Sequence, residues 1–457
     1  MSSRLGIHRL AGALALIPIL LSGIGPARAE NVTLALDDSV KIALASNPTV
    51  QIARENINMA NSIVVQAMSQ GMPKVSLNAN YQRVDKVNTA EFGGNTIQLG
   101  SVDNRSAALV VAQPIDIFGI VPRGTKVARY TKTSAHYALD QAINDVTLQT
   151  KTAYYNVLRA QSLVKVQDDT VAQLQAHLKD TEARNNAGDA TKFEILRART
   201  AVANVQQVQL AAWNGVQLAK AAFNNILVRP LDMPVDLAEP ESPKFYKLDM
   251  QTCLDCAVQN SPDIERADLA VKINEGVAKV TKLAGLPRFN LNWTLNHNYD
   301  TSLFNSRANS WTAYLSASVN VFDGGATRST VDIANSNARN SRSTLRIIGD
   351  AISLQAKQAY LDVTSSRQRI DAAKLALDTA TESMRLADVR YKGGVSTLLE
   401  VLDAQQALTL ASTGHVMALY DYQDSLARME RIVGGPTPFL QMVKNQTETP
   451  IIQQAAN

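Results

Sequence analysis

The side chains that most often perform chemistry are sparse and scattered in this sequence. Apart from His8 near the N-terminus, the histidines share no local spacing that suits metal ligation: His136, His177, His297 and His415. The carboxylates are dispersed, and the chain contains no Walker loop, no GxSxG, no HExxH and no dinucleotide-binding fingerprint. We therefore expect that the protein is not an enzyme, holds no metal and needs no cofactor.

The two cysteines, Cys253 and Cys256, form a CxxC pair. Such a pair can be redox-active or can supply half of a zinc site. A structural zinc site needs four ligands, and neither a second CxxC nor a nearby histidine completes the set. We interpret both cysteines as buried or half-buried small residues on a short amphipathic helix. An oxidised pair is the alternative if the chain is exported.

The first 29 residues carry the pattern of a signal peptide. Arg4 and Arg9 form a basic start, residues 10–21 are apolar, and residues 27–29 (Ala-Arg-Ala) form a small-x-small cleavage site. An uncleaved membrane anchor is the alternative, but the apolar stretch is short for a spanning helix. We expect residues 1–29 to be removed on export.

The bulk composition indicates a long helical chain. Hydrophobic residues make up 46% of the 457 residues, but aromatic residues only 5%. The formal net charge is +4, and loss of residues 1–29 removes three arginines and no acid, leaving +1. Because no lysine or arginine block stands out, we expect no nucleic-acid partner.

A long stretch, 125–187, lacks both glycine and proline and is predicted to form one helix of roughly 90 Å. Within it hydrophobic residues recur at coiled-coil spacing: Val157, Ala160, Val164, Val171, Leu174 and Leu178. The same pattern returns 206 residues later: Val363, Ile370, Ala373, Leu377, Ala380 and Met384. Each long helix therefore needs a long antiparallel partner.

The whole sequence is duplicated, with an offset that falls from 214 to 206 residues. It divides into the signal peptide 1–29, a first repeat 30–229, a proline-rich connector 230–247, a second repeat 248–434 and a flexible C-terminal tail 435–457. Each repeat is predicted to contain a short helix, a β-hairpin and a long helix pair. The hairpins are expected at 73–116 and 287–322, and the helix pairs at 124–227 and 326–431.

The predicted strands alternate apolar and polar residues, with aromatic residues near the strand ends at Trp293, Tyr299 and Trp311. This pattern suits a membrane β-barrel with a wet lumen, although a half-buried hairpin in a soluble sheet would also show it. Four strands cannot close around a lumen, and open edges in lipid leave backbone groups unpaired. We therefore expect several chains to share one barrel, with loops 86–103 and 300–309 outside it.

The turn after each long helix has the same local signal. A glycine that can end a helix precedes a threonine and a glutamate at capping-box spacing. The two turns contain Gly188, Asp189, Ala190, Thr191 and Glu194 in the first repeat, and Gly394, Val395, Ser396, Thr397 and Glu400 in the second. Both are predicted to join antiparallel helices and to form exposed tips, the returning helices spanning about 191–227 and 397–431.

Together these features resemble the TolC family of outer membrane efflux and secretion proteins, over nearly all of residues 34–434. The resemblance implies a mixed α/β membrane protein with four antiparallel transmembrane strands per chain. Three chains would share a 12-stranded barrel, and long antiparallel coiled-coil helices would form a periplasmic α-barrel.

The same resemblance implies the partners and the functional residues. A homotrimer in outer-membrane lipid would meet a periplasmic adaptor (a membrane fusion protein) and an inner-membrane pump, with both tip turns facing the adaptor. Asp378 and Asp388 are the candidate acids of a periplasmic gate; the alternative is that they are solvated acids on a coiled-coil surface.

The sequence thus predicts a channel-tunnel of a tripartite efflux pump or type I secretion system, in the outer membrane of a Gram-negative bacterium. It would conduct cargo passively across the periplasm and the outer membrane. The alternative is a soluble periplasmic coiled-coil adaptor or scaffold. Whether the cargo is a drug, a metal ion or a protein depends on partners encoded elsewhere.

Overall fold

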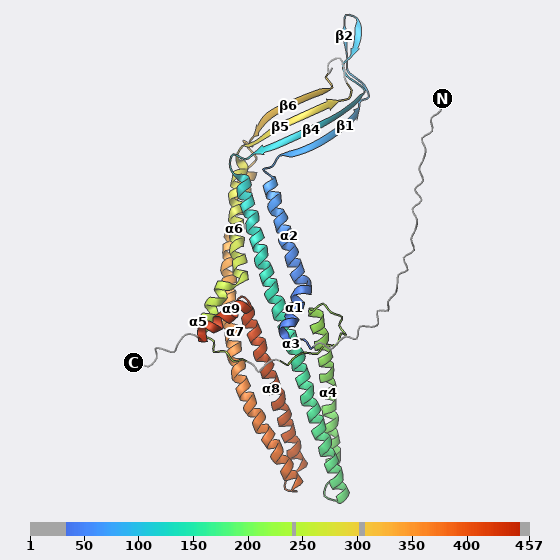
Figure 1. The fold of residues 1–457 in the computed structure, drawn as a ribbon, viewed down its shortest axis with the longest axis vertical. Helices are drawn as coiled ribbons and strands as arrows, with labels where there is room; N and C mark the ends of the chain where they lie inside the picture. The colour runs from blue at the N-terminus through green and yellow to red at the C-terminus, as the bar shows by residue number, and fades with distance from the viewer. Residues whose placement is uncertain (1–32, 240–243, 301–306, 448–457) are drawn as a thin grey trace, which may run out of the picture.

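The computed structural model describes residues 33–239, 244–300 and 307–447. The predicted signal peptide and most of the loop 300–309 lie outside these ranges. The chain is elongated, with a β-sheet at one end and two pairs of long helices reaching the other (Figure 1). No helix in the described ranges is both long enough and apolar enough to span a membrane.

The main helices and strands repeat in the same order in the two halves. Those of the first half are α1 (Leu36–Ser46), α2 (Pro48–Ser69), β1 (Lys74–Arg83), β2 (Thr89–Phe92), β3 (Asn95–Gln98), β4 (Asp103–Ile115), α3 (Ile120–Ala187) and α4 (Lys192–Ile226). Those of the second half are α5 (Met250–Asn260), α6 (Pro262–Lys282), the short 3₁₀ helix η1 (Leu283–Gly285), β5 (Arg288–Asn298), β6 (Asn309–Ser318), α7 (Ala326–Lys392), α8 (Leu398–Ile432) and α9 (Pro436–Thr447). The predicted mixture of four main strands and long helices in a duplicated chain is confirmed.

The two hairpins lie side by side in one antiparallel sheet with the strand order β1-β4-β5-β6. The central pair, β4 and β5, joins the two halves, and Leu109 lies opposite Leu295. Leu77 pairs with Leu109 on one side, and Leu295 pairs with Trp311 on the other. One row of large apolar side chains therefore crosses all four strands.

This register gives the sheet one apolar face and one polar face, because alternate residues of a strand point to opposite sides. The next row on the apolar face contains Val75, Val111, Trp293 and Ala313. A row on the other face contains Ser76, Val110, Thr294 and Thr312. Among the described residues no helix packs against the apolar face, and Leu77, Trp311 and Leu315 are exposed.

The segment between β1 and β4 differs from the sequence-based expectation. Residues 86–103 were expected to form a loop, but they contain a small separate hairpin in which β2 pairs with β3. Gly93 and Gly94 form its turn, and both have positive φ angles (59° and 81°), which glycine adopts without strain. The small hairpin projects beyond the main sheet (Figure 1).

The N-termini of the long helices α3 and α7 are capped in the same way, by an aspartate side chain. Asp116 accepts hydrogen bonds from the amides of Ile120 and Val121, and Asp323 accepts from the amides of Gly325 and Thr327. A carboxylate at this end satisfies amides that have no partner within the helix and complements the helix dipole. The 68 residues of α3 then run for about 100 Å.

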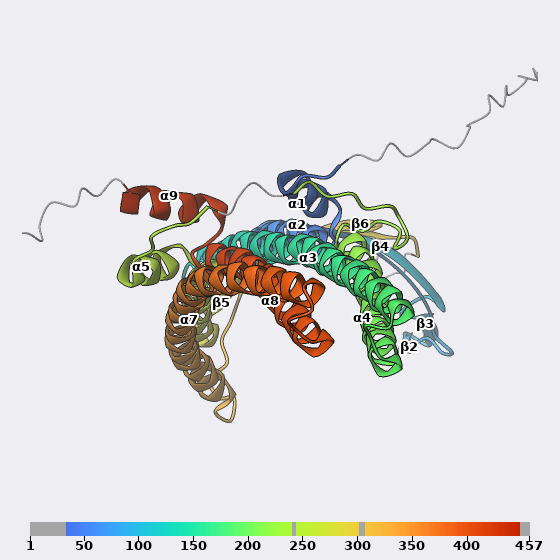
Figure 2. The same cartoon turned by 90° about the horizontal axis from the view of Figure 1, so that it is seen from below.

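The predicted coiled-coil seam packs largely as expected. On α3 the buried positions include Val157, Val164, Val171 and Leu174. On α7 they include Val363, Ile370, Ala380 and Met384. Helix α4 follows α3 and runs antiparallel to it, and α8 follows α7 in the same way. The four helices lie along an arc (Figure 2).

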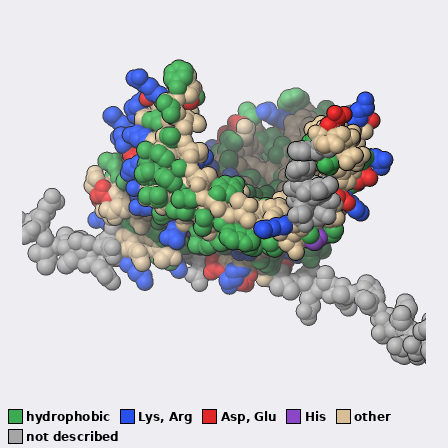
Figure 3. Space-filling view, turned by 90° about the horizontal axis from the view of Figure 1, so that it is seen from above, with side chains coloured by type: hydrophobic (Ala, Val, Ile, Leu, Met, Phe, Trp, Pro, Cys, Tyr) green, Lys and Arg blue, Asp and Glu red, His purple; other side chains and the backbone are tan. Residues whose placement is uncertain are grey.

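Each strand of the main sheet is joined in the chain to one helix of the curved helical layer below it. In the chain, β1 follows α2, β4 precedes α3, β5 follows α6 and β6 precedes α7. Contacts of α3 with both α2 and α6, and of α6 with α7, preserve this order below the sheet. Viewed from the sheet end, the chain is a curved wall hollowed on one side (Figure 3).

The C-terminal segment was expected to be a flexible tail, and this is wrong for its first part. Residues 436–447 form α9, which packs against α5 and α8. Phe439 and Met442 are buried in a cluster with Cys253. Helices α1, α5 and α9 all lie on the convex side of the arc (Figure 2).

Candidate functional site: the helix tips and the membrane-facing sheet

The turn between α3 and α4 is held by backbone and side-chain bonds together. Gly188 has a φ of 92°, and its amide donates to Asn185 O at 3.1 Å while that of Asp189 donates to Arg184 O at 2.8 Å. Thr191 and Glu194 then cap α4 reciprocally: the Glu194 amide donates to Thr191 Oγ1 (3.3 Å), and the Thr191 amide donates to Glu194 Oε2 (2.7 Å). This is the capping box expected from the sequence.

The turn between α7 and α8 repeats the glycine geometry but not the full capping box. Gly394 has a φ of 75°, and the amide of Val395 donates to Arg390 O at 3.0 Å. The Glu400 amide lies 3.4 Å from Thr397 Oγ1, yet the Glu400 carboxylate accepts from Ser396 Oγ (2.6 Å) instead of from the Thr397 amide. The predicted reciprocal box is therefore only half formed here.

Apolar side chains are exposed at both tips. Phe193 and Leu196 are exposed at the start of α4, and Val395 and Leu399 are exposed near the start of α8. A tight turn fixes the positions of these residues, because the glycine and the threonine cap leave the backbone little freedom. The two tips thus present exposed apolar side chains on tight turns.

The ends of α3 and α7 contact each other near the tips, a relationship that local sequence patterns did not reveal. The hydroxyls of Thr181 and Tyr391 lie 3.3 Å apart, and the guanidinium of Arg184 stacks over the Tyr391 ring at 4.4 Å. One turn away, His177 Nδ1 lies 3.9 Å from Asp388 Oδ1. These side chains join the first helix pair to the second.

The two acids proposed for a gate have different surroundings. Asp388 pairs with Lys392 at 2.8 Å and faces His177 on α3. Asp378 is exposed, ten residues earlier on the same helix, which is roughly 15 Å along its axis. The structure therefore does not bring the two acids together within one chain.

The cysteines of the CxxC pair are free, with Cys253 buried and Cys256 half-buried on α5. Burial raises the pKa of Cys253 to about 12 and also raises that of Cys256. Both are therefore thiols at neutral pH, and a thiol is a poor nucleophile compared with a thiolate. The interpretation as packed small residues fits this geometry.

A family model described as outer membrane efflux protein matches residues 40–227 and 253–435, which is most of both halves. The chain belongs to the outer membrane efflux protein family. The two matched segments coincide with the two structural repeats.

Relatives in this family cover most of the chain at low identity. Nodulation protein T of Rhizobium leguminosarum bv. viciae is 22% identical over 88% of this chain and 82% of that protein. Protein CyaE of Bordetella pertussis is 23% identical over 84% and 80%, respectively. The probable efflux pump outer membrane protein TtgC of Pseudomonas putida is 22% identical over 88% and 83%.

Solved structures show the same fold. The CmeC outer membrane channel of Campylobacter jejuni superposes with a TM-score of 0.79 at 16% identity, over 90% of this chain and 89% of that one. The outer membrane protein VceC of Vibrio cholerae has a TM-score of 0.75 at 17% identity, over 88% and 96%.

As a member of the outer membrane efflux protein family, the chain resides in the outer membrane and extends into the periplasm, as the outer-membrane component of an efflux or secretion system. This decides against a soluble periplasmic scaffold. The three aromatic strand positions suit this setting: Trp293 and Trp311 share the apolar face of the sheet, and Tyr299, just beyond β5, stacks edge-on against His297.

Below the sheet, the two repeats of this efflux protein are joined through α3 and α8. Lys151 Nζ lies 2.7 Å from Glu430 Oε2, and both side chains are largely buried. Beside them Thr152 donates to Asp424, and Arg431 pairs with Asp145 at 2.8 Å. Charged and hydrogen-bonded groups therefore hold the two halves in register at mid-height.

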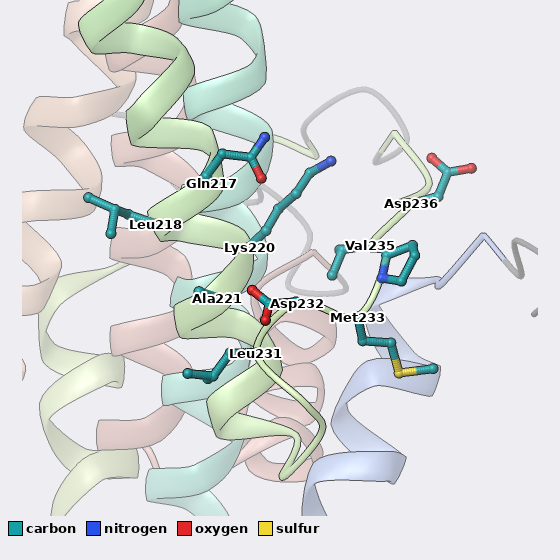
Figure 4. A pocket seen from close by; sticks show the side chains of 10 residues that line it. Gln217, Leu218, Lys220, Ala221, Leu231, Asp232, Met233, Val235 and Asp236 are labelled. Atoms are coloured by element: carbon teal, nitrogen blue, oxygen red, sulfur yellow. The ribbon is translucent and has the colours of Figure 1, made fainter.

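The connector after α4 packs against the outside of that helix. Asn224 Nδ2 donates to the carbonyls of Leu231 (3.0 Å) and Met233 (2.8 Å), which fixes the path of the connector. A groove of about 570 Å³ lies between α4 and the connector, where Lys220 and Asp236 extend from opposite sides (Figure 4). Tyr154 completes this junction, since its hydroxyl donates to Ala238 O at 2.6 Å; burial raises its pKa to about 12.

Proposed function

We propose that three copies of this chain form one continuous channel-tunnel that conducts cargo passively out of the periplasm. The observation that carries the proposal is the single four-stranded sheet with one apolar face, in which each strand is joined to a helix and two of these helices, α3 and α7, are each about 100 Å long. The apolar face would meet lipid and the polar face would line a wet lumen.

The need for further copies follows from the two outer strands. In the sheet order β1-β4-β5-β6, both β1 and β6 have one edge without a partner strand in the part of the chain that the structure describes. Unpaired backbone groups in hydrocarbon cost several kcal/mol each, so the edges require neighbours. Joining β6 of one copy to β1 of the next closes a barrel, and three copies supply 12 strands.

The helix tips are the proposed docking surfaces for a periplasmic adaptor that links the channel to an inner-membrane pump. Supporting this, the tips lie at the end of the molecule farthest from the sheet (Figure 1) and present fixed apolar side chains such as Phe193 and Val395. The pump would supply the free energy, and the channel itself would perform no chemical step. Asp378 and Asp388 are proposed to line the periplasmic entrance.

The names of the relatives suggest the range of cargo. TtgC is named for an efflux pump, and a further relative in Pseudomonas putida is named for pyoverdine export. We propose that this chain likewise passes the cargo that its pump delivers.

The membrane orientation is tested with two neighbouring residues of β5. Leu295 lies on the apolar face, and Asn296 lies on the polar face. A lysine facing lipid costs roughly 2–4 kcal/mol near the bilayer midplane, whereas a lumen-facing lysine does not. We expect Leu295→Lys to reduce recovery of the oligomer from outer membranes and Asn296→Lys to leave it unchanged; equal recovery of both would overturn the proposal.

A further inference from the structure

A cationic groove lies between α3 and α6, directly below the sheet. It has a volume of about 230 Å³, and its lining comprises Arg123, Lys126, Val127 and Tyr130 from α3 with Lys272, Glu275, Gly276 and Lys279 from α6. These positions are spaced i, i+3, i+4 and i+7 on both helices, so they form two facing stripes. Four of the eight residues are cations.

Close packing of the two helices fixes the shape of this groove. A Cβ atom at Gly276 would lie only 2.4 Å from Val127 Cγ2, so glycine allows the helices to approach here. The antiparallel pairing then places Arg123 and Lys279 together at the upper end, nearest the sheet. Lys126 lies one turn below them, with its ammonium 5.8 Å from the Tyr130 ring centroid.

The positive charge of the groove is only partly neutralised from within. Its carboxylate, Glu275, is already bound by Arg342 of α7 at 2.5 Å, and Lys272 pairs with Asp268. Within the described ranges neither Lys126 nor Lys279 has an ion-pair partner, and both are exposed. The upper part of the groove therefore offers two ammonium groups beside the guanidinium of Arg123, whose Nη1 already donates to the carbonyls of Phe118 and Gly119. Cationic donors of this kind suit a phosphate group.

The groove opens toward the outside of the wall. Lys126 and Asn144 are 18 residues apart on α3, which is five full turns at 3.6 residues per turn, so they share one face. A Cβ atom at Gly435, in the turn that leads into α9, would lie 2.6 Å from Asn144 Oδ1, so Asn144 lies next to that turn. Because α9 lies on the convex side of the arc (Figure 2), Lys126 faces the same side, away from the hollow.

The height of the groove matches the edge of a membrane. Strand β4 ends at Ile115, α3 begins at Ile120, and Arg123 lies in the first turn of that helix. The polar headgroup layer extends roughly 5–8 Å beyond the hydrocarbon core on each side. Lysine and arginine side chains can reach several ångströms along a surface to bring their charges to that layer.

We propose that this groove binds the phosphate headgroup of an anionic phospholipid from the periplasmic leaflet, such as phosphatidylglycerol. The proposal rests on the membrane orientation given above and adds a lipid site to it. The phosphodiester would lie between Arg123, Lys126 and Lys279, and Tyr130 would form part of the groove below. Lipid bound there would brace the junction at which α3 and α6 enter the sheet.

The test uses the full-length mature protein, purified in a neutral detergent and stripped of lipid. Phosphatidylglycerol or phosphatidylcholine is titrated in, and native mass spectrometry counts the lipid molecules retained per chain. We expect wild type to retain phosphatidylglycerol in preference to phosphatidylcholine. Each lysine near an anionic lipid contributes about fivefold in affinity, so Lys126→Gln/Lys279→Gln should weaken phosphatidylglycerol binding roughly 25-fold.

A matched control removes the same charge elsewhere. Lys357→Gln/Lys374→Gln neutralises two exposed lysines of α7 and should bind lipid as wild type does. Equal retention of the two lipids by wild type, or wild-type affinity in the groove variant, would refute the proposal. Displacement of phosphatidylglycerol by millimolar inorganic phosphate would indicate a soluble-anion site and also refute it.

Two further measurements allow the lipid site and the proposed channel function to be tested separately. Circular dichroism and oligomer size verify that the groove variant folds, and the single variant Lys279→Gln provides a milder change. Conductance in pure phosphatidylcholine bilayers tests the channel without the anionic lipid. Wild type and the groove variant should both conduct there. Loss of conductance in both proteins would count against the proposed channel function, whereas the lipid-retention measurement tests the lipid site.

Discussion

His177 on α3 and Asp388 on α7 face each other across 3.9 Å, near the end of the molecule farthest from the sheet. Lys392 also faces this site from α7, and Asp180 lies one turn along α3. Burial lowers the pKa of His177 below its ordinary value of 6.5, and the nearby Asp388 opposes that effect only in part. The imidazole is therefore neutral in the folded protein at neutral pH.

This relationship predicts that acidification weakens the contact between the two helix pairs. An unfolded histidine takes up a proton near pH 6.5, but the folded state resists protonation until a lower pH. The free energy of unfolding should thus fall as the pH drops below about 6.5 and level off below the folded pKa. We expect wild type to lose more thermal stability between pH 7.5 and pH 5.5 than His177→Asn does; parallel losses would contradict this.

The Lys151–Glu430 pair should couple the two repeats energetically. The lysine and glutamate side chains are only 16% and 13% exposed, so removing one partner leaves a poorly solvated charge. We expect Glu430→Leu or Lys151→Met to lower the free energy of unfolding by about 3 kcal/mol each. The double variant Lys151→Met/Glu430→Leu should cost less than the sum, and a double-mutant cycle from denaturant unfolding measures the difference. Simple additivity would show that the pair is not coupled.

The features predictable from sequence were those encoded within one element or repeated at a fixed offset. Val157 and Val171 are buried because coiled-coil spacing places them on one helix face. Gly188 and Gly394 have left-handed φ angles because a helix that reverses direction needs such a residue at its end. The duplication made each pattern easier to recognise, because the same local sequence pattern appears in both repeats.

The contacts that escaped prediction join segments far apart in the chain. His177 and Asp388 are separated by 211 residues, and no local pattern specifies which faces of α3 and α7 meet. The polar composition after Gly435 suggested a flexible tail, although Pro436 at a helix start and Phe439 and Met442 one turn apart were available signals. Their apolar partner is α5, nearly 200 residues earlier, so the sequence of the C-terminal segment did not indicate which element it packs against.

The tip glycines should be needed for export but not for membrane insertion. Gly188 has a φ of 92°, and its amide donates to Asn185 O, so proline is incompatible with the angle and removes the hydrogen bond. We expect Gly188→Pro, and Gly394→Pro by the same argument, to distort the turn at a local cost of about 3 kcal/mol or more.

The measurement compares two properties in cells: recovery of the oligomer from outer membranes, and accumulation of a dye that the wild-type chain exports. Both proline variants should insert normally and fail to lower dye accumulation. Gly215→Ala is the control, because this glycine lies within α4 with open space around it. Alanine there should stabilise the helix by about 0.5–1 kcal/mol and preserve export. Normal dye export by both proline variants would argue against a docking role for the tips.

Helix α9 should shield Cys253 from modification. The thiol is fully buried in the cluster that contains Phe439, and burial raises its pKa to about 12, so both access and thiolate content are low. In a Cys256→Ser background, we expect a maleimide to label Cys253 very slowly at pH 7.5. Phe439→Ala should loosen α9, since truncating a buried phenylalanine costs about 3–5 kcal/mol, and should raise the labelling rate at least tenfold. Leu440→Ala is the control, because the neighbouring Leu440 is exposed and its loss should leave the rate unchanged. If Cys253 stayed equally unreactive in both variants, α9 would not be the element that covers it.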